Sequence, residues 1–265
     1  MGTRANGGFT IIETMLFLGI SGLLIVGMLA TTGASINIQR YHDAVETFKT
    51  LIQNQYSELT SVQNDRDNTW DCNSLAQSQT GGTEVRGQSD CVLLGRYLTV
   101  VDSTVSAYSV LGRPNQAQVL TGNDIQKLSS NYELNISTVT QDVSTLEWGT
   151  RIAWPKVDSS GANRITATTP RSIAMLFVRS PDSGQIYTFT SDTVPGTPTP
   201  QTLNAMLVGG ATIPGQSQRT ICVDSNGLFV TADFSIFIND YATGPSSIES
   251  RSNDYIKSIG GATKC

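Results

Sequence analysis

The chain has 265 residues, which is enough for one or two domains with a sizeable core. Its 38% hydrophobic and 15% charged residues exclude a protein embedded in the membrane along its whole length, so any membrane segment has to be local. The formal net charge of -5 excludes a protein whose entire surface attracts nucleic acid, although one basic face would still be compatible with it.

The N-terminal region changes abruptly from polar to apolar. Residues 1–8 are polar and glycine-rich, and an apolar stretch then extends from Phe9 to about Ala34. Glu13 is its only charged residue, and no ionisable side chain occurs from Thr14 to Gln39. Because about 20 residues cross a hydrocarbon core of ~30 Å, this stretch predicts a membrane-spanning helix. A cleaved secretory signal is the alternative, but its apolar core of roughly 7–15 residues is shorter.

The start of the apolar stretch carries a motif. The residues Gly8-Phe9-Thr10-Ile11-Ile12-Glu13 resemble the processing site of type IV prepilins and pseudopilins. This resemblance, which covers about the first fifth of the chain, implies that a prepilin peptidase cleaves between Gly8 and Phe9 and methylates the new N-terminus. It also implies that Glu13 meets the N-terminal amine of a neighbouring subunit, which would compensate a buried charge. A carboxylate resting at the membrane interface near a helix N-terminus is the alternative for Glu13.

The helix is expected to continue beyond the membrane. Apolar residues recur at intervals of three and four, at Tyr41, Val45, Phe48, Ile52 and Leu59. No proline or glycine interrupts residues 34–68, so we expect one helix from Phe9 to about Val62, which is about 80 Å long. Its second half is expected to cover a sheet. His42, the only histidine, lies on this helix, where we expect a solvated or interfacial role.

The remainder of the chain predicts an antiparallel β-rich head. Short β-branched or aromatic runs predict strands at Leu93–Val101, Tyr132–Val139, Thr145–Trp154, Ser172–Val178, Gln185–Thr190, Thr220–Val223, Leu228–Thr231 and Phe234–Ile238. A polar loop is expected over residues 66–90 and a short helix over residues 201–207. The predicted fold is therefore α+β and pilin-like, with a leader at 1–8, a long helix at 9–62 that is transmembrane over about 9–34, and a globular extracytoplasmic head at 63–265.

Four cysteines, without a C-x-x-C pair and with a single histidine, argue against a zinc site, and we expect neither a metal nor a cofactor. Two disulfides are expected if the head is exported, and three connectivities are open. We favour Cys72 with Cys91 and Cys222 with Cys265, because these pairs are close in sequence and the second one fixes the C-terminus. Free buried thiols are the alternative.

The charge balance reverses between residues 151 and 179. Asp158 is the one acidic residue there, against five basic ones, namely Arg151, Lys156, Arg164, Arg171 and Arg179. If they shared one face, they would favour a weak contact with DNA or an acidic surface. Scattered solubilising charge is the alternative.

The sequence contains no H-E-x-x-H, P-loop or dinucleotide motif, so we expect no enzyme. The resemblance implies a structural subunit of a type IV pilus-like filament, and the chain's length favours a minor pilin. Such a subunit is a single-pass precursor in the cytoplasmic membrane and then part of an extracellular filament at the cell surface, used in adhesion, twitching motility or DNA uptake. Its partners would be other pilin subunits, the prepilin peptidase and the membrane assembly platform. A pseudopilin of a type II secretion or competence system is one alternative, and a membrane-anchored extracytoplasmic binding protein or enzyme is another.

Overall fold

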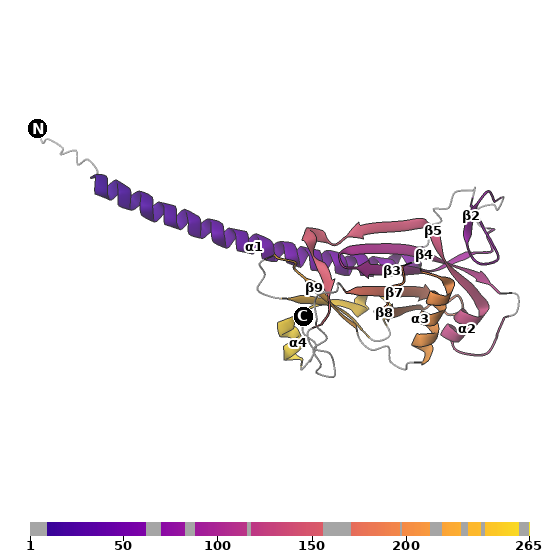
Figure 1. Cartoon of the computed structure of the whole chain (residues 1–265). Coiled ribbons are helices and arrows are strands. Elements are labelled where there is room, and N and C mark those ends of the chain that lie inside the picture. Colours follow the sequence, from indigo (N-terminus) through magenta and orange to yellow (C-terminus); the bar gives the residue numbers. More distant parts are fainter. Residues whose placement is uncertain are drawn as a thin grey trace, which may run out of the picture.

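The computed structural model describes residues 10–61, 70–82, 88–115, 118–155, 171–196, 198–212, 219–228, 233–239, 242–259 and 265. A long helix, α1, projects from a globular head, and its first residues lie at the far end of the projection (Figure 1). The helices of the described residues are α1 (Ile11–Thr60), α2 (Asp124–Asn131), α3 (Pro200–Thr212) and α4 (Asn253–Ser258), with 3-10 turns η1 (Glu147–Gly149) and η2 (Pro245–Ser247).

The described strands form two antiparallel sheets and a small hairpin. A five-stranded sheet has the order β5 (Tyr132–Thr145), β4 (Thr104–Pro114), β3 (Val92–Val101), β7 (Ser172–Arg179), β8 (Ile186–Ser191). A four-stranded sheet has the order β11 (Ile248–Ser252), β10 (Phe234–Ile238), β9 (Arg219–Asp224), β6 (Arg151–Ala153). Strands β1 (Trp70–Cys72) and β2 (Ser78–Thr80) pair with each other at the end of the head away from the projecting helix (Figure 1).

Helix α1 has two halves with different surroundings. Thr10 caps its N-terminus, because its side-chain oxygen accepts a hydrogen bond from the Glu13 backbone N–H at 3.3 Å. Its buried residues begin at Tyr41 and follow helical spacing to Leu59. The predicted division into a projecting apolar half and an amphipathic half that packs on the head is therefore confirmed.

The core has two layers, one on each face of the five-stranded sheet. Strand β7 shows this directly, since Phe177 lies in the layer with α1 and the four-stranded sheet, whereas Leu176 lies in the layer with α2 and α3. Successive side chains of a strand point to opposite faces, so β7 is buried on both sides. The second half of α1 is consequently one wall of the main core, and the head holds the helix firmly.

Both predicted disulfides are present. Cys72 on β1 bonds to Cys91 just before β3, and Cys222 on β9 bonds to Cys265. The first closes the polar segment that contains the β1–β2 hairpin, and the second ties the last residue to the four-stranded sheet. In the chain-entropy model, each such bridge contributes roughly 3–4 kcal/mol.

Several sequence predictions need correction. The predicted strand Thr145–Trp154 is too long, because only its last part, β6 (Arg151–Ala153), forms a separate strand, whereas β5 ends at Thr145 and Trp148 and Gly149 adopt left-handed backbone conformations with φ of 57° and 73°. These conformations break a strand. The predicted loop 66–90 contains the β1–β2 hairpin. Of the predicted strand Leu228–Thr231, only Leu228 is described, and it belongs to no strand.

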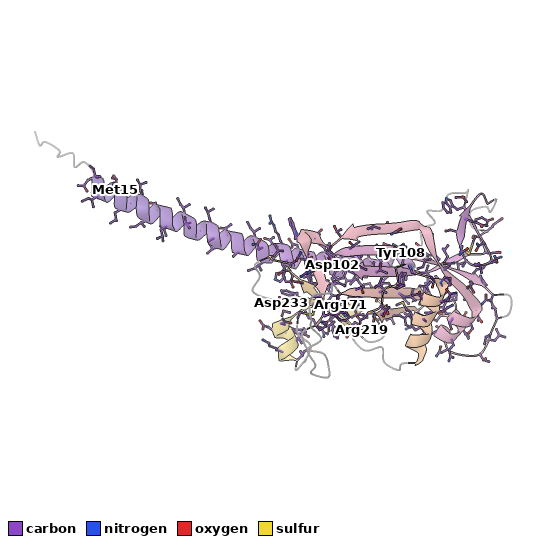
Figure 2. All side chains as sticks on the ribbon, viewed as in Figure 1. Met15, Asp102, Tyr108, Arg171, Arg219 and Asp233 are labelled. Atoms are coloured by element: carbon purple, nitrogen blue, oxygen red, sulfur yellow. A yellow bond between two sulfur atoms is a disulfide. The ribbon has the colours of Figure 1, made fainter. Side chains whose placement is uncertain are left out.

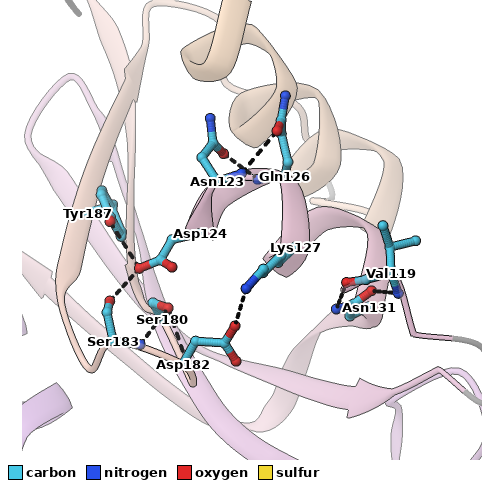
Figure 3. Close-up of polar contacts among 10 residues, drawn as sticks. All are labelled: Val119, Asn123, Asp124, Gln126, Lys127, Asn131, Ser180, Asp182, Ser183 and Tyr187. Carbon is cyan, nitrogen blue, oxygen red and sulfur yellow. Dashed lines mark hydrogen bonds and ion pairs between the residues drawn. The ribbon is translucent and has the colours of Figure 1, made fainter. Parts of the chain in front are cut away.

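Polar side chains join α2 to the β7–β8 turn (Figure 3). Asp124 accepts hydrogen bonds from the hydroxyls of Ser183 and Tyr187, and Lys127 pairs with Asp182 at 3.2 Å. The Ser183 hydrogen bond is the main cause that lowers the pKa of Asp124 from its ordinary value. These contacts fix α2 against the five-stranded sheet.

Three buried tyrosines make the head sensitive to alkali. Burial raises the pKa of Tyr41, Tyr56 and Tyr97 from the ordinary 10.0 to about 12 in each case. Between pH 10 and 12 the folded state therefore binds more protons than the unfolded state. The contribution of these tyrosines to the free energy of unfolding is complete below pH 10 and is lost as the pH rises towards 12. We expect a lower urea midpoint at about pH 11 than at about pH 9 for the full chain in detergent. Tyr56→Phe should reduce this dependence, and an unchanged dependence would contradict the assignment.

Candidate functional site

The projecting half of α1 exposes an unusually large apolar surface. Its large hydrophobic side chains from Ile11 to Leu29 are between 55% and 77% exposed. Figure 2 shows one of them, Met15, far from the head. Among the described residues, α1 is the one helix that is long and apolar enough to cross a membrane. By length and composition it fits a membrane anchor, and a signal sequence would meet the same criterion.

Four hydroxyl groups of this half are satisfied within the helix itself. The hydroxyls of Thr14, Thr31, Thr32 and Ser35 each donate to a backbone carbonyl three or four residues earlier, for example Thr14 to Ile11 at 2.9 Å. An apolar environment has no water to satisfy such groups, so they have to bond internally. The segment therefore suits lipid or a tightly packed bundle of helices.

Glu13 is the one charged side chain between Thr10 and Gln39. It lies in the first turn of α1, and its backbone N–H is bonded to Thr10. From the part of the chain that the structure describes, no hydrogen bond or ion pair reaches its carboxylate. The predicted processing residues Gly8 and Phe9 lie outside the described residues, so their role stays a prediction.

Small residues form a ridge further along the same half. Gly27, Ala30 and Ala34 follow one another at helical spacing. A side chain added at Gly27 would meet nothing within 4 Å, so the space beside it is open in the isolated subunit. Small residues allow helices to approach closely in a bundle, and the ridge is thus suited to helix–helix contact.

The structure does not gather the predicted basic residues on one face. Arg171 is a buried structural residue, with a side chain 3% exposed that pairs with Asp192 at 3.1 Å and donates to the Thr220 carbonyl at 2.8 Å. It is therefore wrong as a contact for DNA or another anion. Figure 2 shows Arg171 close to Arg219, which also pairs with Asp192, at 3.0 Å.

The other members of the set are no better placed. Arg151 pairs with Asp224 at 3.0 Å. Arg179 is exposed, but it lies at the last position of β7, whereas Arg171 immediately precedes the first. At strand spacing the two arginines are about 25 Å apart. Lys156 and Arg164 lie outside the described residues. The predicted shared basic face is not present among the described members.

The head also contains a groove that sequence reasoning missed. It has a volume of about 670 Å³ and lies between α1 and strands β3 to β5. Arg96 is buried at its end and pairs with Glu58 at 2.8 Å and Asp142 at 3.1 Å. The sequence signal that could have indicated it is an arginine within an otherwise largely apolar strand. Because its charge is already compensated, Arg96 serves to join α1 to β5.

The single histidine of the chain is packed against an aromatic ring. His42 lies edge-on to Phe234, with ring centroids 4.3 Å apart. No group of three or more His, Cys, Asp or Glu side chains that could hold a metal ion occurs within the ranges that the structure describes. The projecting half of α1 is the candidate functional site, because its exposed apolar surface is suited to contact with lipid or with other helices.

Comparisons with protein-family models, curated proteins and solved structures all return no match, so the function of the projecting helix has to be inferred from its own residues and geometry.

Proposed function

We propose that the chain is a subunit of a type IV pilus-like filament and acts there as a minor pilin. In this proposal, α1 first anchors the precursor in the cytoplasmic membrane, and the same apolar half then packs among the helices of other subunits. The observation that carries the proposal is the exposed apolar half of α1, whose first turn carries the carboxylate of Glu13 without a partner among the described residues.

An exposed apolar surface of this size is expected to be buried by lipid or by another protein. Monomeric soluble proteins rarely expose continuous apolar patches above a few hundred Å², and each Å² removed from water is worth about 25 cal/mol. Side chains on every side of the helix are apolar, so one partner face would leave the rest in water. Lipid, or a bundle in which the helix is surrounded, covers all of it.

Glu13 favours the bundle as the final state. A carboxylate inside lipid is costly, whereas a neighbouring subunit's N-terminal amine would compensate it. Cleavage after Gly8 would create such an amine at Phe9, four residues before Glu13. The head is held to the second half of α1 by buried contacts, so it would lie outside the bundle and would not obstruct it.

The proposal predicts that Gly8→Arg leaves the precursor uncut. A peptidase that requires a small residue before the cleaved bond cannot accept the bulky cation, so the chain should keep residues 1–8 and remain membrane-bound. Intact mass spectrometry of purified protein measures this, because the processed wild type should lack these residues and carry one added methyl group.

A matched control is Gly2→Arg, which adds the same charge away from the cleavage site and should be processed normally. N-terminal sequencing of Gly8→Arg that still begins at Phe9 would refute the assigned site. A wild-type protein that retains its first eight residues would instead favour an anchored binding protein or enzyme.

A further inference from the structure

A half-exposed tryptophan lies where α1 enters the head. Trp148 is 51% exposed and belongs to η1, directly after β5, which runs towards the end of the head from which α1 projects (Figure 1). The Arg40 guanidinium lies over its ring at 4.7 Å. Arg40 is the residue immediately before Tyr41, the first buried residue of the helix. The two side chains therefore form one contact at the base of the projection.

The backbone keeps this ring outward. Trp148 has φ 57° and ψ 22°, a left-handed conformation that is unusual for a bulky residue. The neighbouring Glu147 carboxylate is bonded to Thr47 on α1 at 3.3 Å, and Asn226 donates to the Gly149 carbonyl at 3.0 Å. The turn is thus fixed on both sides, and the indole is presented to the outside instead of to the core.

The position of this contact along α1 matches the edge of a bilayer. The last exposed large hydrophobic residue of the projection is Ile36, and Arg40 lies four residues later, about 6 Å along the axis. A bilayer of ~40–45 Å with a hydrocarbon core of ~30 Å leaves about 5–8 Å of headgroups on each side. If Ile36 lies at the hydrocarbon edge, Arg40 and Trp148 lie at the level of the headgroups.

We propose that Trp148 and Arg40 form an interfacial contact through which the head rests on the extracytoplasmic phospholipid headgroups while the subunit is in the membrane. Tryptophan prefers this layer because its ring is apolar and its N–H is polar, and arginine binds lipid phosphate. The contact would set both the depth of the span and the orientation of the head. This inference rests on the proposed membrane-inserted stage of the subunit.

Tryptophan quenching by brominated lipids tests the contact in the full chain. The variant Trp70→Phe/Trp154→Phe leaves Trp148 as the sole tryptophan and is reconstituted into phosphatidylcholine–phosphatidylglycerol vesicles. Phosphatidylcholine brominated near the headgroup should reduce Trp148 emission by about half, and lipid brominated near the chain ends should reduce it far less. Arg40→Ala in this background should weaken the shallow quenching about twofold.

The matched control is Trp148→Phe/Trp154→Phe, whose remaining Trp70 lies on β1 at the opposite end of the head and should not be quenched (Figure 1). Carbonate extraction of the same vesicles separates the two proposals. If the chain resists extraction but Trp148 is not quenched, the interfacial contact is wrong and the membrane-inserted stage stands. The same conclusion holds if Trp148 emission changes only when the subunit assembles with others. A chain that carbonate releases overturns the membrane-inserted stage as well.

Discussion

Glu13→Gln should abolish incorporation into filaments while leaving membrane insertion intact. Glutamine keeps the shape of the side chain but removes the charge that would compensate a neighbouring N-terminal amine. An uncompensated buried charge costs about 3–5 kcal/mol, which corresponds to a loss of roughly a hundredfold or more in incorporation. Immunoblots of sheared fibres measure incorporation, and carbonate extraction of membranes measures insertion.

The neighbouring residue supplies the control. Thr14→Val also removes a polar group from the first turns of α1, but the Thr14 hydroxyl bonds only to backbone carbonyls of its own helix, including Ile11 at 2.9 Å. This variant should assemble normally. If Glu13→Gln reached wild-type levels in the fibres, the carboxylate would have no part in assembly and would only occupy the membrane interface.

The features that could be predicted from sequence depend on local patterns. The apolar run and the following stripe predicted a helix over 9–62, and α1 spans Ile11–Thr60 among the described residues. Strand β10 matches its predicted bounds, Phe234–Ile238, because Asp233 precedes the largely apolar run and Asn239 and Asp240 follow it. The disulfide pairing followed from proximity along the chain.

The features that were missed depend on tertiary contacts. Strand β4 contains weak strand formers such as Ser106, Ser109 and Gly112 among its β-branched and aromatic residues, and it is held in the sheet by pairing on both sides with β3 and β5. Helix α2 has only eight residues, and its Asp124 and Lys127 are held by Ser183 and Asp182 of the β7–β8 turn. No local pattern shows such partners.

Arg171 shows the same limitation at the level of a single residue. In the sequence it is one of five basic residues near one another, and the composition alone cannot distinguish a solvated arginine from a buried one. Tertiary contacts make this arginine a buried one, since its guanidinium lies 4.9 Å from the Trp154 ring and bonds to Asp192 and to the carbonyl of Thr220. It therefore links β7, the segment after β8 and β9, and so the two sheets of the head.

Arg171→Met should accordingly be one of the most destabilising single changes in the head. Methionine fills part of the volume but leaves the carbonyls of Ala153 and Thr220 without their donor and Asp192 with Arg219 as its remaining partner. Breaking a buried pair costs about 3–5 kcal/mol. Guanidinium unfolding of the full chain in detergent, followed by near-ultraviolet circular dichroism with the disulfides intact, measures the loss.

Arg151→Met is the matched control, because Arg151 is also an arginine paired with an aspartate, Asp224, but its side chain is 43% exposed. An exposed pair of this kind contributes about 0–1 kcal/mol, so this variant should unfold close to the wild type. Arg171→Lys retains the charge without the planar fork and should lie between the two. A loss for Arg171→Met as small as that for Arg151→Met would contradict the structural role of Arg171, and the two sheets would then be held together by their apolar layer.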